Sequence, residues 1–451
     1  MQDFDMTLPN TNVCPVCTGQ PGALPVLAKD ALDKSLLLGK TLGCVIHDQS
    51  SFDRKSYFYP DLPMGYQITQ LFAPTCMDGK VSFFVDQFAA ERSVTIRDAH
   101  METDTAKMIH DGGQALIDYN RAWTPLVEVV TWPDFSDADA VSEFLKELQR
   151  IARYNNISDA DMEKWQMRVD VNISIRISDD APLGTRVELK NINSFGAVRR
   201  SIEHEYNRQV LLMNTGGVIE QETRWRDDAA GDSYSMRSKE NALDYRYFPE
   251  PDLPILDIKN LDLGYQNIAI VIPFSIVKQL KEEYGFHKEY INTLINDKLV
   301  LDYFQACVAD GWDPKTIVKW IAWPIAAYMT QEYKTIDALP FDRRLFLWFV
   351  RTAQEWKFQD VQLKIVMDQM LQTGKDAQSI ISEQWFDAPG FSSDDLRVVV
   401  QQILDANPAI VEQYKEWKTT TIWFFVWQVM KETWGKVNPK DATELLTEML
   451  T

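Results

Sequence analysis

Two cysteines near the start of the sequence have the spacing of a metal-binding turn. Cys14 and Cys17 form the Cys-x-x-Cys motif of PNTNVCPVCTGQPGALP. Thiolates at this spacing can take two positions of a tetrahedral zinc site, but a closed structural site needs four ligands. The other cysteines stand alone in the sequence: Cys44, Cys76 and Cys307. We therefore interpret Cys14 and Cys17 as half of a zinc site whose other pair is expected just upstream.

Acidic residues in strand-like segments offer a second kind of chemistry. Glu102 and Asp104 lie in HMETDTAKMIHD, directly after the strand-like residues 94–96. Glu128 lies in the apolar run PLVEVV, which we expect to be buried. Carboxylates from separate segments, with basic residues nearby for phosphates, are what Mg²⁺ bound to a nucleotide requires. Structural ion pairs are the competing interpretation, and spacing alone favours them; five histidines are too few to indicate a histidine-rich metal centre.

Two predicted strands would position a further set of charged side chains. Residues 168–177 alternate between apolar and polar positions, which predicts a half-buried strand. A turn-like segment joins them to residues 185–192, so the two should form an antiparallel pair. A solvated sheet face is the usual interpretation of such a surface, and a floor that holds a charged substrate is the alternative. The polar face of the pair includes Arg168, Asp170, Arg186, Glu188 and Lys190.

The elements around these residues predict an α+β protein. The chain is rich in strands and turns up to about residue 260, with helices at 140–154 and 198–213, and it becomes helical from about residue 265. A length of 451 residues with 45% hydrophobic content allows two or three domains, each with a real core. The sequence contains no P-loop, no G-x-G-x-x-G and no G-x-S-x-G motif.

Charge and hydropathy narrow the expected partners and location. A net charge of −20 argues against a protein that coats nucleic acid through an overall positive field, although local basic patches can still contact RNA. No stretch approaches the roughly 18 apolar residues of a membrane span, and the first residues do not resemble a signal peptide. We therefore expect a cytoplasmic protein with no membrane partner.

Five segments in order resemble the B subunit of the glutamyl/aspartyl-tRNA amidotransferase. They are NTNVCPVCTGQPGALPVL, FDRKSYFYPDLPMGYQITQ, HMETDTAKMIHD, GTRVELKNINSF and MRSKENALDYRYFPEPDLP. The resemblance covers essentially the whole chain. It implies an antiparallel-sheet cradle domain (1–264) that binds ATP and Mg²⁺, an all-α helical domain (265–395) and a small helical tail domain (396–451) that binds tRNA.

The family's chemistry is indirect aminoacylation of tRNA. The side-chain carboxylate of glutamate or aspartate misacylated onto tRNA is phosphorylated by ATP, and ammonia then displaces phosphate to give Gln-tRNA or Asn-tRNA. The implied partners are an amidase A subunit that supplies ammonia, a small C subunit that completes a heterotrimer, and the misacylated tRNA. A non-catalytic tRNA-binding scaffold is the rival interpretation.

The resemblance also implies roles for particular residues. Glu102 and Glu128 would be Mg²⁺ ligands, and Asp170, Glu188 and Lys190 would line the same cradle as catalytic residues. The expected cofactor contacts are Arg168, Lys190 and Asn191, and Cys14 and Cys17 would hold Zn²⁺ if it is bound. Three tyrosines in the second segment could be site walls or core aromatics: Tyr57, Tyr59 and Tyr66.

The start of the sequence departs from the family. The family begins with a strand reading roughly Gly-Leu-Glu-x-His, whose Glu and His reach the metal, followed by a further cysteine pair, and this sequence has neither. We expect that the printed sequence begins at an internal methionine, and a natural truncation is the alternative. An upstream in-frame segment encoding Glu-x-His and two cysteines would support the enzyme, and its absence would support the scaffold.

Tryptophan repeatedly stands where the family has glycine. The chain has 14 Trp but only 19 Gly, whereas average usage of about 7% would give roughly 32 Gly. Trp423 and Trp427, one helical turn apart, are expected to overpack. Our hypothesis is that the source reads UGA as glycine; a genuine tryptophan-rich divergence is the alternative. The positions are Trp123, Trp165, Trp225, Trp323, Trp356, Trp385, Trp417, Trp423, Trp427 and Trp434.

Overall fold

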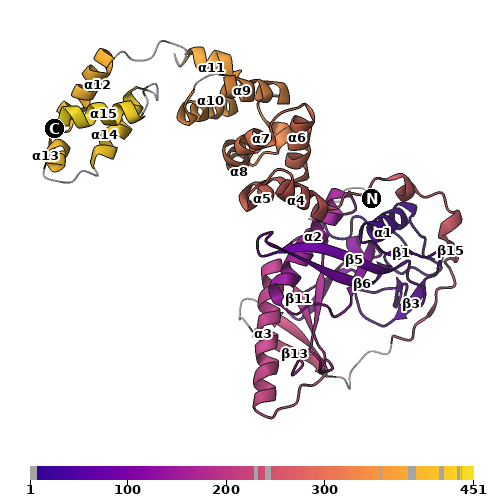
Figure 1. The fold of residues 1–451 in the computed structure, drawn as a ribbon. Coiled ribbons are helices and arrows are strands. Elements are labelled where there is room, and N and C mark those ends of the chain that lie inside the picture. The colour runs from indigo at the N-terminus through magenta and orange to yellow at the C-terminus, as the bar shows by residue number, and fades with distance from the viewer. Residues whose placement is uncertain are drawn as a thin grey trace. The chain divides into compact units, whose positions relative to one another are not determined.

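The chain forms two compact units, residues 1–279 and 280–451. The computed structural model describes residues 8–227, 232–238, 245–355, 358–383, 393–415, 421–433, 437 and 439–450. Within this part, the first unit combines sheets with helices, and the regular elements of the second are all helical (Figure 1). The predicted α+β class is therefore confirmed. The division into three domains at residues 264 and 395 stays a prediction.

Two four-stranded sheets form the framework of the first unit. One has the order β1-β5-β6-β9 and is antiparallel throughout. The other has the order β10-β11-β12-β13, in which only the β11–β12 pair is parallel. The predicted antiparallel pair is therefore confirmed, as β10 and β11, although β10 is shorter than expected. The strands are β1 (Val45–Ile46), β5 (Cys76–Val85), β6 (Ala90–Thr103), β9 (Pro125–Thr131), β10 (Val169–Ile173), β11 (Val187–Ile192), β12 (Glu222–Asp227) and β13 (Asp232–Ser238).

Shorter strands border these sheets. β3 pairs with both β4 and β14, β2 pairs with β15, and β7 pairs with β8. The bounds are β2 (Gln49–Ser50), β3 (Asp53–Ser56), β4 (Tyr66–Thr69), β7 (Lys107–Asp111), β8 (Gln114–Asp118), β14 (Phe248–Pro249) and β15 (Leu256–Asp257).

Three helices cover the sheets of the first unit: α1 (Lys29–Thr41), α2 (Ala138–Tyr154) and α3 (Phe195–Asn214). The last two were predicted from their apolar periodicity, and both begin at side-chain caps. Asp137 accepts a hydrogen bond from the backbone N–H of Ala140, and Ser194 accepts one from Ala197. The helix α3 lies along the sheet that contains β11 and β13 (Figure 1). The buried faces of sheets and helices share one apolar core.

A β-bulge on β6 determines which side chains point away from this core. Ile96 pairs with Thr131 on β9, but Asp98 pairs with Val130, so Arg97 is an extra residue on β6. Because side chains alternate along a strand, one extra residue exchanges its two faces. Even-numbered residues such as Ile96 are in the core before the bulge, and odd-numbered ones such as Met101 are in the core after it.

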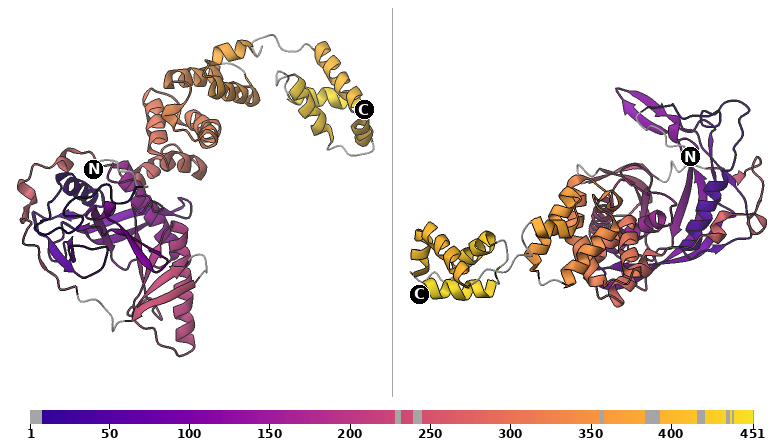
Figure 2. Two further views of the ribbon diagram at one scale, coloured as in Figure 1. Left: turned by 180° about the vertical axis from the view of Figure 1, so that it is seen from behind. Right: turned by 90° about the horizontal axis from the view of Figure 1, so that it is seen from above.

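The second unit is built from helices. Figure 2 shows them in orange and yellow in two further views. The last of them, from α12 onward, share an apolar core of their own. Within the described residues, no helix is both long and apolar enough to cross a membrane. The helix α4 (Pro273–Glu282) spans the boundary between the units, and the α-helices that follow it are α5 (Lys288–Ile295), α6 (Lys298–Ala309), α7 (Pro314–Trp320), α8 (Ala326–Glu332), α9 (Arg343–Glu355), α10 (Asp360–Thr373), α11 (Ala377–Glu383), α12 (Ser393–Ala406), α13 (Pro408–Lys415), α14 (Ile422–Glu432) and α15 (Pro439–Leu450).

Two of the tryptophans at family glycine positions have a backbone conformation that favours glycine. Trp123 has φ of 63° and Trp165 has φ of 60°, a left-handed conformation that costs an L-residue roughly 1–2 kcal/mol. The overpacking predicted for Trp423 and Trp427 is wrong, because their side chains on α14 are 65% and 58% exposed. Four of the ten positions lie outside the described residues: Trp356, Trp385, Trp417 and Trp434.

Trp165 allows the glycine hypothesis to be tested in the chain itself. Trp165 and Trp132 are both 48% exposed, but only Trp165 has a positive φ. Glycine relieves left-handed strain, so Trp165→Gly should retain about 1–2 kcal/mol more unfolding free energy than the matched control Trp132→Gly. Urea unfolding measures the difference in unfolding free energy, and equal losses in the two variants would contradict the strain.

Mass spectrometry of protein from its source should find glycine at position 165; tryptophan there would reject the hypothesis.

Candidate functional site

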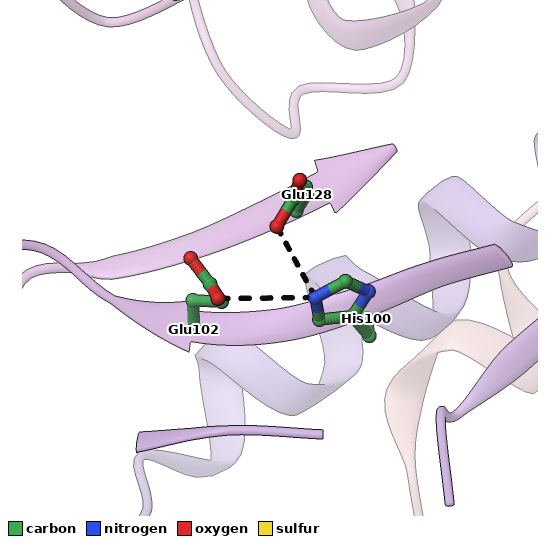
Figure 3. A group of neighbouring side chains, drawn as sticks. All are labelled: His100, Glu102 and Glu128. Carbon is green, nitrogen blue, oxygen red and sulfur yellow. Dashed lines mark ion pairs between the residues drawn. The ribbon is translucent and has the colours of Figure 1, made fainter. Parts of the chain in front are cut away.

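Three side chains from neighbouring strands meet above the sheet formed by β6 and β9. His100 and Glu102 are two residues apart on β6 and therefore lie on the same face of the strand. Glu128 lies directly opposite His100 on β9. The His100 Nε2 atom is 3.3 Å from Glu128 Oε2 and 3.9 Å from Glu102 Oε1 (Figure 3). Their ligand atoms all lie within 4.8 Å of one another. This donor set, an imidazole nitrogen and two carboxylates, is suited to a divalent cation.

Strong hydrogen bonding holds the imidazole of His100 in place. Its Nδ1 atom is 2.7 Å from Asp98 Oδ1, and Asp98 also accepts a 2.6 Å hydrogen bond from Arg97 Nε. Burial lowers the pKa of His100, but hydrogen bonds to Asp98, Glu102 and Glu128 outweigh it and raise the pKa to about 11. Without a bound ion, the imidazolium therefore carries the positive charge that these carboxylates require.

A lysine from β3 also approaches Glu102. Lys55 Nζ is 3.7 Å from Glu102 Oε1, and it lies 5.2 Å from the centre of the Tyr245 ring. Although burial raises the pKa of Glu102, the hydrogen bond with His100 and the charge of Lys55 lower it overall. Glu102 is thus kept ionised in a largely buried position, as a metal ligand must be.

Asp104 forms a separate charged group at the end of β6. This buried carboxylate accepts a 2.8 Å hydrogen bond from Arg168 Nη2, and its other oxygen is 3.0 Å from Arg121 Nε. Two guanidinium groups therefore share one carboxylate. The side chain of Arg168 remains 43% exposed and can contact a bound anion as well.

The charged side chains predicted on β10 and β11 do meet. Lys190 Nζ is 2.9 Å from Asp170 Oδ2 and 3.4 Å from Glu188 Oε1. Glu188 also accepts a 2.9 Å hydrogen bond from the Thr223 hydroxyl. Asn191, by contrast, is exposed with φ of 63° and is not among the residues that line the cavity described next.

One cavity of 3220 Å³ in the first unit joins these groups. Small-molecule sites typically measure roughly 300–1,000 Å³, so a nucleotide and the end of a larger substrate fit together. Tyr57 also lines this cavity, whereas Tyr66 is buried under the guanidinium of Arg54 and Tyr59 is exposed outside it. The predicted residues along its walls are Glu102, Glu128, Arg168, Asp170, Glu188 and Lys190.

The two cysteines of the Cys-x-x-Cys motif lie in a tight turn on the wall of the same cavity. Their sulfur atoms are 3.2 Å apart, and the backbone N–H of Cys17 points to Cys14 Sγ at 3.4 Å. In the described part of the chain, they belong to no cluster of three or more metal-ligating side chains. Their role as half of a zinc site stays a prediction.

The structure corrects two expectations about the carboxylates. Glu102 does not follow a strand that ends near residue 96, because β6 continues to Thr103. Glu128 is not buried, since its side chain is 52% exposed toward the cavity. The run PLVEVV packs only its odd-numbered valines against the core, Val127 and Val129.

Several residues of the site were not predicted from the sequence. His100 was set aside because histidines are sparse, although it is two residues from Glu102 and therefore on the same face of a strand. That period-2 spacing was the available signal for His100 and Asp98. Lys55 and Arg121 come from segments far from β6 in sequence, and the sequence offers no local signal that links them to it.

Comparison with known families identifies the family of the chain. The family model of the GatB/GatE catalytic domain matches residues 1–263, and that of the GatB domain matches residues 302–450. The chain belongs to the GatB family. The whole cavity and all of its lining residues fall within the match to the GatB/GatE catalytic domain.

Curated GatB relatives match almost the entire chain. Proteins named as the B subunit of aspartyl/glutamyl-tRNA(Asn/Gln) amidotransferase, from Caldanaerobacter subterraneus subsp. tengcongensis and Persephonella marina, are 37% and 39% identical to it over 444 residues. Each alignment covers 98% of this chain and 93% of the relative. A protein of the same name from Symbiobacterium thermophilum is 37% identical over 452 residues, 98% of this chain and 92% of its own.

The raised pKa of His100 predicts how stability depends on pH. Its folded-state value of about 11 lies above the ordinary value of 6.5. The stabilisation is therefore fully present below about pH 6.5 and is lost as the pH rises toward 11. In EDTA, the unfolding free energy of the wild type should exceed that of His100→Gln, on the order of 3 kcal/mol at neutral pH. Urea unfolding should show this difference shrinking as the pH rises.

A matched control is His110→Gln, which changes an exposed histidine on β7. Its stability should follow that of the wild type across the same pH range. A difference between His100→Gln and the wild type that grows with pH would contradict the assigned charge.

Proposed function

We propose that this protein is the B subunit of a tRNA-dependent amidotransferase and that its first unit carries the ATP-dependent step. The observation that supports this most is the cavity whose wall holds Glu102 and Glu128, both next to His100, together with the charged group around Lys190. It lies within the match to a catalytic domain, and relatives of nearly the same length are named as this subunit.

The reaction needs activation because a carboxylate is a poor acyl donor. The γ-phosphoryl group of ATP is transferred to the side-chain carboxylate of the glutamate or aspartate on tRNA, which gives an acyl phosphate and ADP. Ammonia then attacks the acyl carbon, the C–O bond to phosphate breaks, and a proton leaves the nitrogen to give the amide. Phosphate is the leaving group that the free carboxylate lacks.

Glu102 and Glu128 would hold the Mg²⁺ of the nucleotide. Their donor oxygens meet at one place, and the lowered pKa keeps Glu102 ionised. When bound, the ion offsets the negative charge of the phosphates. Lys55, with its Nζ 3.7 Å from Glu102 Oε1, would help to hold that carboxylate in place.

The remaining cavity residues would bind the substrates. Arg168 would contact phosphate oxygens, because it shares its carboxylate partner with Arg121 and is partly exposed. Lys190 would be oriented by Asp170 and Glu188 to contact the carboxylate or phosphate of the reacting group. Asn191 would contact the nucleotide only if β11 rearranged, since it lies outside the cavity.

We further propose that the chain works in a complex. Because the relatives are named as one lettered component of an amidotransferase, other components are implied. An amidase A subunit would supply ammonia, a small C subunit would complete a heterotrimer, and the 396–451 region would bind the misacylated tRNA. Cys14 and Cys17 would contribute two thiolates to a Zn²⁺ site. A cytoplasmic location fits a translation enzyme of this kind.

Removing a carboxylate should abolish the chemical step. The chain is co-expressed with amidase and C subunits, and conversion of Glu-tRNA to Gln-tRNA is followed with ATP. Because the ion stabilises charge in the transition state, Glu102→Gln and Glu128→Gln should each lower the rate at least about 100-fold. The effect should persist when ammonium chloride replaces glutamine, because the defect lies after ammonia formation.

The matched control is Glu91→Gln, at the other end of β6, where Glu91 pairs with Lys278. It should leave the rate within about twofold, as for ordinary surface changes. Unchanged conversion in Glu102→Gln would refute the metal role. If the wild-type complex binds tRNA but converts none of it, the chain acts as a tRNA-binding scaffold instead.

A further inference from the structure

His100 lies where a third ligand of the cation site would be. Its Nε2 atom faces Glu128 Oε2 at 3.3 Å and Glu102 Oε1 at 3.9 Å. Ligand atoms typically lie about 2.0–2.3 Å from an ion such as Zn²⁺, so two ligands of one ion are at most about 4.6 Å apart. Both distances from Nε2 fall within that limit, and all three ligand atoms lie within 4.8 Å of one another, so a small side-chain adjustment would let one ion reach all three.

The other ring nitrogen of His100 has a fixed partner. Nδ1 is 2.7 Å from Asp98 Oδ1, and Asp98 is buried and held by Arg97 Nε at 2.6 Å. A carboxylate that accepts the N–H of one ring nitrogen leaves the other nitrogen available to a metal and fixes the ring plane. This carboxylate–histidine pair is the usual support of a metal-ligating histidine.

We propose that His100 coordinates the divalent cation through Nε2 and that Asp98 is the positioning residue that orients its ring. The inference deepens the proposed function, because it presumes that Glu102 and Glu128 hold a cation. One imidazole and two carboxylates form a mixed nitrogen and oxygen set, which suits Mn²⁺, Co²⁺ or Zn²⁺ better than Mg²⁺. Such a set can accept Mn²⁺ in place of Mg²⁺, so Mn²⁺ can report on the same site.

The competing role for His100 is that of a counter-ion. A protonated imidazole would pair with Glu102 and Glu128 and would be displaced when the ion binds. The two roles predict opposite changes in metal affinity when the imidazole is removed. Loss of a ligand weakens metal binding, whereas loss of a competing positive charge strengthens it.

Manganese is a suitable probe because it is paramagnetic. The full chain is freed of metal with EDTA, returned to buffer and titrated with Mn²⁺ alone, and bound ion is measured by electron paramagnetic resonance. Pulsed experiments should show ¹⁴N coupling from a directly bound imidazole, and labelling histidine with ¹⁵N should change that coupling. His100→Gln should abolish it and weaken Mn²⁺ binding about 10–100-fold.

Asp98→Asn separates the positioning role from ligation. It should keep the nitrogen coupling but change its magnitude, and weaken Mn²⁺ binding by a similar factor of about 10–100. The control His110→Gln changes a histidine on β7 outside the cluster and should leave coupling and affinity unchanged. Circular dichroism establishes that each variant is folded, and the labelled wild type tests ligation even if a variant is not.

Two results would overturn the inference: bound Mn²⁺ without nitrogen coupling in the wild type, or tighter Mn²⁺ binding in His100→Gln. The proposed function fails by a different measurement, namely unchanged conversion of Glu-tRNA in Glu102→Gln. If conversion depends on Glu102 while Mn²⁺ shows no nitrogen coupling, only the assignment of His100 is wrong.

Discussion

One extra residue in β6 is the constraint on which the site depends. Before Arg97 the strand places Val94 and Ile96 in the core, and after it Ala99 and Met101 take their place. The bulge therefore places Asp98, His100 and Glu102 on the face opposite these core residues without interrupting the sheet, and Glu102 lines the cavity. On the neighbouring β5, the residue level with the bulge is Asp78, which has a left-handed φ of 54°, so both strands change face together.

The charged side chains on the buried strands need partners of opposite charge. An isolated buried charge costs several kcal/mol, so each one here has partners. Lys190 is shared by Asp170 and Glu188, which leaves surplus negative charge for a bound cation to neutralise. Around Asp104 the positive groups are in excess, because Arg121 and Arg168 share one carboxylate. The cavity thus offers both a cation-binding and an anion-binding region, as a metal–nucleotide complex requires.

Sequence patterns predicted the elements better than the site. Strong periodicity predicted α2, α3 and the β10–β11 pair, because those elements bury one continuous face. The length of β6 was missed because the bulge breaks its alternation, and the exposure of Glu128 was missed because neighbouring valines suggested full burial. Lys55 and Arg121 reach the site only through tertiary packing, which no local pattern encodes. Trp423 and Trp427 show the opposite error, since a packing cost was inferred where both side chains are exposed.

One divalent cation should bind between Glu102 and Glu128 in the cavity of the first unit. Crystals of the chain grown with Mn²⁺ and a non-hydrolysable ATP analogue test it most directly, because the anomalous signal of manganese locates the ion without reference to a mechanism. One strong peak is expected in contact with Glu102, Glu128 and His100, with the phosphates of the analogue beside it. A peak at another place in the cavity, with these three side chains still paired to one another, would contradict it.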